Sequence, residues 1–169
     1  MDTLDAIFTR RSIRKYTDEP IGGEIVATLL KAGLQAPSAK NLQPWHIVVL
    51  TRREILDRIP KFHPYAAMLR EAPLALLVCG DRQAQPMEGY WVQDCSAVTQ
   101  NILLAAHSLG LGAVWLGVYP REDRIRGVCE LLKLPLHITP LSLIALGRPD
   151  EKKEPADRFD PKKIHYNGW

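Results

Sequence analysis

The chain has 169 residues, of which 46% are hydrophobic and 24% charged, and its net charge is +3. This length suits one ordinary domain. The composition excludes a disordered chain, a collagen-like repeat and a coiled coil, and the charge excess is too small to indicate a polyanionic partner.

A basic cluster follows a short predicted helix at the N-terminus. Leu4, Ile7 and Phe8 recur with helical spacing, and Asp2 or Thr3 suits the N-cap. The next residues are Arg10-Arg11-Ser12-Ile13-Arg14, which place three guanidiniums and a hydroxyl within five positions. Arginine binds phosphate oxygens in pairs. For the cluster on its own we favour a solvated basic turn. Nucleic-acid binding is disfavoured because the other basic residues are mixed with acidic ones.

A polar loop is predicted between the second helix and the first strand. That helix begins after Gly22-Gly23, has Val26, Leu29, Leu30 and Gly33 on one face, and stops before Pro37. The loop reads Pro37-Ser38-Ala39-Lys40-Asn41-Leu42-Gln43-Pro44. Its amide and hydroxyl groups suit the polar edge of a heteroaromatic ring, or the internal bonds of a well-made turn. A buried strand is predicted from Trp45 to Thr51.

Helices and strands alternate through the middle of the chain. Helices are predicted at 53–59 and 65–71, and a strand at Leu74–Cys79. The longest helix is predicted from Glu88 to Leu109, with an apolar face that includes Cys95 and Ile102. We interpret its His107 as a satisfied core or interface histidine, and Asp94 and Glu88 as surface and capping groups rather than a catalytic carboxylate pair.

The predicted elements continue with a glycine-rich helix end and two more strands. Gly110 and Gly112 end the long helix, and a strand is predicted at Ala113–Tyr119. A helix then starts at Pro120, and a strand at Ile138–Leu146 is interrupted at Pro140. We therefore expect one α+β domain, residues 1–147, with a mostly antiparallel or mixed sheet of about four strands.

Residues 148–169 form a C-terminal extension of different character. Half of them are charged and three are proline, yet the chain ends Ile164-His165-Tyr166-Asn167-Gly168-Trp169. A disordered tail has little use for such apolar side chains. The extension either folds over its own domain or crosses onto a partner subunit.

The sequence offers no convincing catalytic side chain of its own. It contains no GxSxG motif, and its five histidines lack metal-ligand spacing. The three cysteines, Cys79, Cys95 and Cys129, are predicted to be buried thiols. We expect neither a signal peptide nor a membrane segment, and therefore a cytoplasmic protein. A cofactor is the remaining candidate for carrying the chemistry.

Taken together, these motifs resemble the nitroreductase family of FMN-dependent oxidoreductases. The resemblance is carried by the 10–14 cluster, the 37–45 loop that ends in Trp45, the run Gly110-Leu111-Gly112-Ala113-Val114-Trp115-Leu116-Gly117, and Ala145-Leu146-Gly147 with the later Arg158. It implies a three-layer sandwich, with a mostly antiparallel sheet between helices and a C-terminal arm exchanged in a homodimer.

The resemblance also implies a set of FMN-binding residues. Arg10 and Ser12 would bind the phosphate and ribityl chain, with Arg11 nearby and Arg158 also on the phosphate. Arg14 would approach the flavin pyrimidine edge, where a positive charge favours the reduced cofactor. The backbone amides of Leu116 and Gly117 would face the flavin N5 and O4. The partner subunit would supply Pro37, Ser38, Ala39 and Asn41.

The implied activity is transfer of hydride from NAD(P)H through FMN to a nitroaromatic, a quinone or a similar small acceptor, by a ping-pong mechanism. An FMN store or redox sensor without turnover is an alternative, as is a dehydrogenase or dehalogenase that uses the same flavin site. Two departures from the family pattern bear on this choice. The chain lacks a large insertion that would cover the flavin, and it has Leu116-Gly117 where many members have an acidic residue.

Overall fold

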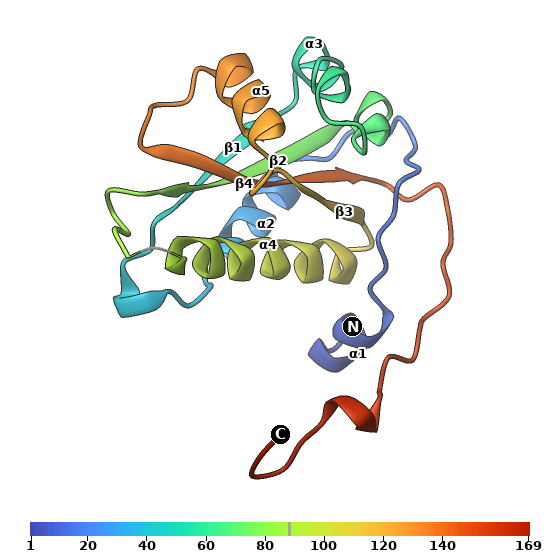
Figure 1. The fold of residues 1–169 in the computed structure, drawn as a ribbon. Coiled ribbons are helices and arrows are strands. Elements are labelled where there is room, and N and C mark those ends of the chain that lie inside the picture. The colour runs from blue at the N-terminus through green and yellow to red at the C-terminus, as the bar shows by residue number, and fades with distance from the viewer. Residues whose placement is uncertain (88) are drawn as a thin grey trace.

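The structure is a computed structural model that describes residues 1–87 and 89–169. A four-stranded antiparallel sheet lies between two helical layers (Figure 1), with the strand order β1-β2-β4-β3. The strands are β1 (Trp45–Leu50), β2 (Leu74–Asp81), β3 (Gly112–Gly117) and β4 (Ile138–Gly147). The helices are α1 (Thr3–Thr9), α2 (Gly23–Leu34), α3 (Arg53–Leu56), α4 (Tyr90–Ser108) and α5 (Glu122–Leu132). The expected three-layer α+β fold is therefore confirmed.

The two central strands divide the hydrophobic core into two halves by simple alternation. On β2, Leu74, Leu76 and Val78 face α2 and α4, whereas Ala75, Leu77 and Cys79 face the layer of α3 and α5. Successive side chains of a strand point to opposite faces, so a strand covered on both sides is apolar at nearly every position. This explains why β2 and β4 appeared in the sequence as continuous apolar runs.

The helical layer of α2 and α4 is built around a glycine contact. Gly33 of α2 lies against Ile102 of α4, and a Cβ atom at position 33 would lie 2.8 Å from Ile102 Cγ1. The absence of a side chain at this position therefore lets the two helices approach closely. In the last turn of α4, His107 Nε2 lies 2.8 Å from Thr9 Oγ1, and this contact connects α1 to the layer. It agrees with the interpretation of His107 as a satisfied histidine.

Several element boundaries differ from the predictions for local reasons. The predicted helix at 53–59 ends as α3 at Leu56, and a 3-10 turn, Ile59–Lys61, contains Pro60. The predicted helix at 65–71 is another 3-10 turn, Ala67–Arg70. Pro140 does not interrupt β4, because a register shift opposite Val78 and Cys79 absorbs it. The predicted start of the long helix at Glu88 lies outside the described residues.

The C-terminal extension has two parts that behave differently. Residues 148–156 run alongside residues 10–17 of the same chain, whereas residues 157–169 continue past α1 and away from the domain (Figure 1). Phe159, Tyr166 and Trp169 are largely exposed there. Within the described ranges, no helix is both long and apolar enough to cross a bilayer.

Candidate functional site

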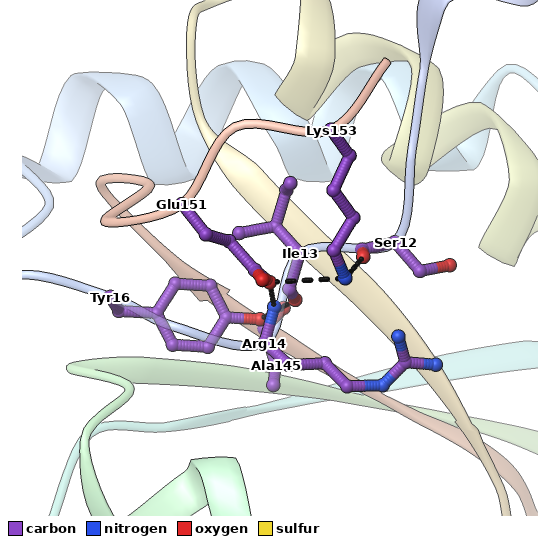
Figure 2. A network of polar contacts seen from close by, with 7 residues as sticks. All are labelled: Ser12, Ile13, Arg14, Tyr16, Ala145, Glu151 and Lys153. Carbon is purple, nitrogen blue, oxygen red and sulfur yellow. Dashed lines mark hydrogen bonds and ion pairs between the residues drawn. The ribbon is translucent and has the colours of Figure 1, made fainter. Parts of the chain in front are cut away.

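The basic cluster lies in an extended segment that the C-terminal extension holds in place. Thr17 N donates to Arg148 O and Asp150 N to Lys15 O, so the two stretches pair antiparallel. Figure 2 shows the next contacts: the Glu151 carboxylate accepts the amide N–H of Arg14 at 2.5 Å and pairs with Lys153 at 3.2 Å. Lys153 in turn donates to the carbonyl of Ser12. The bonds to Ser12, Arg14, Lys15 and Thr17 are made to the backbone of the segment and do not occupy the side chains of Ser12 and Arg14.

Alternation along the segment sorts its side chains into two sets. In an extended chain, residues two apart point to the same side. Ile13 packs on Gly112, where a Cβ would lie 2.7 Å from Ile13 Cγ2. Ser12 and Arg14 point away from the polar network, toward the same side in Figure 2. Arg10 is the C-cap residue of α1 and begins the segment.

Arg11 is committed to the backbone. Its Nε donates to Glu154 O at 2.9 Å, and its two terminal nitrogens donate to Arg10 O and Ala156 O. Arg11 is thus an anchor of the C-terminal extension, and its nitrogens already have acceptors.

Arg10 and Arg158 share a pocket of about 650 Å³ beside α1. Burial, together with the neighbouring guanidiniums of Arg11 and Arg158, lowers the pKa of Arg10. Among the described residues, no carboxylate lies within ion-pair distance of Arg10 or Arg158, although Asp157 lines the pocket. An anion bound here would relieve the mutual repulsion of these cations.

A second pocket, of about 450 Å³, brings Arg14 to Leu116 and Gly117. In an antiparallel ladder, alternate residues direct both their N–H and their C=O to one side. Val118 N donates to Leu141 O on β4, whereas Ala113 O accepts from Ile13 N on the opposite edge. The amide of Gly117 therefore faces the free edge of β3, in the direction of Arg14, and the amide of Leu116 faces β4.

The 37–41 loop is a strained turn held by one buried carboxylate. Lys40 and Asn41 have positive φ angles of 53° and 54°, and so does Gln43, two residues after the loop, at 49°. Asp94 Oδ1 accepts the amide N–H of Ala39 at 2.9 Å, and Gln85 Nε2 lies 3.4 Å from Asp94 Oδ2. Strain of this kind persists where the surroundings fix the backbone, and this anchor contributes to that.

The interpretation of Asp94 as a surface group is wrong. Its exposed fraction is only 4%, because it lies on the side of α4 that carries Cys95 and Val98. Its position next to Cys95 and four residues before Val98 was the available signal in the sequence. The other carboxylate of the suggested pair, Glu88, lies outside the described residues.

The two polar segments lie at opposite ends of α4 within one chain (Figure 1). His107 holds the end that carries α1 and the 10–14 segment, and Asp94 holds the end that carries the loop. These two residues are thirteen positions apart, or about 20 Å along a helix. One chain therefore keeps the 10–14 segment and the 37–41 loop apart.

Comparison with known proteins identifies the relatives of the chain. A model of the nitroreductase family matches residues 7–63 and 61–148. The chain belongs to the nitroreductase family. A protein of Methanothermobacter thermautotrophicus, provisionally named NADH dehydrogenase/NAD(P)H nitroreductase, is 52% identical over 169 residues, which are 100% of this chain and 88% of the relative.

Solved structures of the family share the fold over nearly the whole chain. A Parabacteroides distasonis protein with the same provisional name superposes with a TM-score of 0.96 at 45% identity, over 99% of this chain and 98% of that one. A provisionally named nitroreductase from Desulfovibrio desulfuricans, solved in complex with FMN, has a TM-score of 0.86 at 35% identity, over 100% of this chain and 98% of that one.

Proposed function

We propose that this chain transfers electrons from NAD(P)H through FMN to a nitroaromatic, a quinone or a similar small acceptor, using one site for donor and acceptor in turn. As a nitroreductase-family member, the chain is an FMN-dependent NAD(P)H oxidoreductase. When bound, FMN would supply the redox chemistry. The protein supplies binding, orientation and charge.

The observation that carries the proposal is the order of three residues along one segment: Arg10 lines one pocket, Arg14 lines another, and Ser12 lies between them in the chain. These residues connect the pocket of Arg10 and Arg158 to the pocket at Gly117. Four residues of extended chain span about 13 Å, which suits an elongated ligand with an anionic group at one end and a ring at the other. FMN has this form, with its phosphate and its flavin.

The residues present fit FMN at both ends. At the phosphate end, Arg10 and Arg158 supply positive charge without a carboxylate partner among the described residues, and Ser12 supplies a hydroxyl. At the ring end, the Gly117 amide is a donor on a free strand edge. A Cβ at Gly117 would meet nothing within 4 Å, so a flat group has room to approach.

We further propose a homodimer with two shared FMN sites. The separation of the 10–14 segment from the 37–41 loop along α4 supports it, because a partner related by two-fold symmetry brings its loop to this segment without any change in either chain. Residues 157–169, with exposed Phe159, Tyr166 and Trp169, are the arm that wraps the partner. Pro37, Ser38, Ala39 and Asn41 then contact the flavin of the other subunit.

A visible absorption spectrum of the freshly purified protein tests the proposal. We expect flavin bands that bleach when NADH or NADPH is added without oxygen, and the nucleotide that bleaches them faster is the preferred donor. Bands that persist with both nucleotides would favour the alternative of an FMN store without turnover. A colourless protein that takes up no added FMN would contradict the proposal.

A further inference from the structure

The carbonyl of Gly117 receives two side-chain donors from elements outside the sheet. His63 Nε2, from the segment before the Ala67–Arg70 turn, lies 3.0 Å from Gly117 O, and Arg124 Nη1, from the first turn of α5, lies 2.8 Å from it. A carbonyl oxygen has two lone pairs, so both are used. Glycine is the residue with the widest backbone freedom, and these two bonds remove that freedom next to the amide that faces Arg14.

Only one of the two donors brings a charge. His63 is almost completely buried, and burial lowers its pKa, which favours the neutral ring. Because a carbonyl only accepts, the proton of the neutral ring lies on Nε2. The charged residues that line this pocket are Arg14 and Arg124, and both are positive.

The guanidinium of Arg124 is held in place and forms no ion pair with a carboxylate among the described residues. It lies over the ring of Tyr65, 5.4 Å from the ring centre, a favourable arrangement for a cation. The adjacent Asp123 pairs with Arg121 at 3.4 Å. Arg124 Nε is buried and has no hydrogen-bond partner among the described residues, so the bond from Nη1 to Gly117 O is the hydrogen bond that fixes this guanidinium within the described part of the chain.

We propose that Arg124 is a positioning residue for the redox-active edge of the flavin. It orients Gly117 and sets a second positive charge beside that of Arg14, which favours the more negative, reduced cofactor over the oxidised one. The inference rests on the proposed FMN site. It also gives Leu116-Gly117 a physical meaning: among the described residues, the charged side chains that line the pocket at this edge are the two arginines Arg14 and Arg124.

The test is the midpoint potential of FMN bound to the intact protein, together with the dissociation constant of oxidised FMN. Arg124→Gln keeps a hydrogen-bond donor but loses the charge. We expect the preference for reduced over oxidised FMN to fall about tenfold, which makes the potential of this two-electron couple more negative by about 30 mV. Arg124→Lys keeps the charge and should stay close to the wild type.

Arg126→Gln is the matched control. Arg126 is exposed on the same helix and lines a different pocket, with Arg58 and Lys61, so the same loss of charge should leave the potential unchanged. An equal shift in both glutamine variants, or no shift in Arg124→Gln, would overturn the proposal.

A milder variant covers the case in which Arg124→Gln does not fold or retains no flavin. Tyr65→Leu removes the exposed ring under the guanidinium but leaves the charge. A smaller shift in the same direction supports the proposal, and an unchanged potential contradicts it. Wild-type protein that binds no FMN would instead refute the proposed function itself, so the two failures are distinguishable.

Discussion

The two ends of α4 present polar groups in contrasting ways. At one end, residues 10–16 are an extended strip fixed from outside by residues 148–156, largely through backbone bonds and exposed charges. At the other end, the 37–41 loop is a tight turn fixed from inside by buried Asp94. A strip displays every second side chain over a long distance, whereas a turn presents a few groups at one point. The strip can therefore contact a ligand along its whole length, whereas the turn can contact it at one edge only.

The largest effect is expected in a hybrid dimer in which one subunit carries a substitution in the strip and the other carries one in the loop. Arg10→Ala damages the strip, and Asn41→Gly removes a side chain from the loop while allowing the positive φ. If each site combines one strip with the partner's loop, a hybrid dimer of these two variants has one intact and one doubly damaged site. It should recover about half of the wild-type flavin content, measured by absorbance on hybrids purified with two different tags.

The reciprocal hybrid is the control for this experiment. Wild type paired with a chain that carries both substitutions has one lesion in each shared site, so it should hold little flavin. Sites contained within single chains would reverse the two results: this hybrid would keep one intact site and the first would have none.

Within the strip, Arg10 and Arg11 should differ sharply. Loss of a charged contact to phosphate costs about 1.5–3 kcal/mol, so Arg10→Ala should weaken FMN binding roughly 10- to 100-fold. Arg11→Ala should weaken it less, because the nitrogens of Arg11 donate to backbone carbonyls. Fluorescence titration of the apoprotein measures both, with the exposed Arg52→Ala as control. FMN binding that Arg10→Ala leaves unchanged would refute the assignment of Arg10.

At the loop, the buried carboxylate can be tested by an isosteric pair. Asp94→Leu leaves the Ala39 amide without its acceptor and should lower the free energy of unfolding by about 1–3 kcal/mol. It should also speed amide exchange in residues 38–43 and weaken FMN binding about tenfold, since a less ordered loop must be fixed on binding. Asp94→Asn retains an acceptor for Ala39 N–H and should lose much less. Equal losses in the two variants would exclude the hydrogen bond as the cause.

The sequence predicted the fold well because its signals are local. The alternating faces of β2 and the glycine contact of α2 with α4 follow from periodicity and small residues, and the nitroreductase resemblance covers nearly the whole chain. The predictions were wrong where a proline or a strand irregularity determines the local backbone. Examples are the 3-10 turn that contains Pro60 and the register shift next to Pro140.

The site was predicted less completely because its supports are distant in sequence. Arg11 and Arg14 look alike in a basic cluster, and only the path of residues 148–156 shows that Arg11 faces carbonyls. Asp94 looked like a surface group because its partner, the Ala39 amide, lies 55 residues away. His63 and Arg124 carry no motif and gain their meaning only where both meet Gly117 O.

The smallest expected effect is a pH dependence of the contact that Glu151 makes with the strip. The amide N–H of Arg14, followed by Lys153, lowers the pKa of Glu151 below its ordinary value near 4.5. Its contribution to stability is therefore complete above that ordinary value and is lost as the pH falls through the lower pKa of the folded state. Because the ion pair is near the surface, we expect less than about 1 kcal/mol. Urea midpoints between pH 7 and pH 3 should fall more steeply in wild type than in Glu151→Gln, which cannot titrate at this position. Parallel curves would show that the charge of Glu151 contributes nothing to the free energy of unfolding. The strip would then be held by its neutral backbone hydrogen bonds alone.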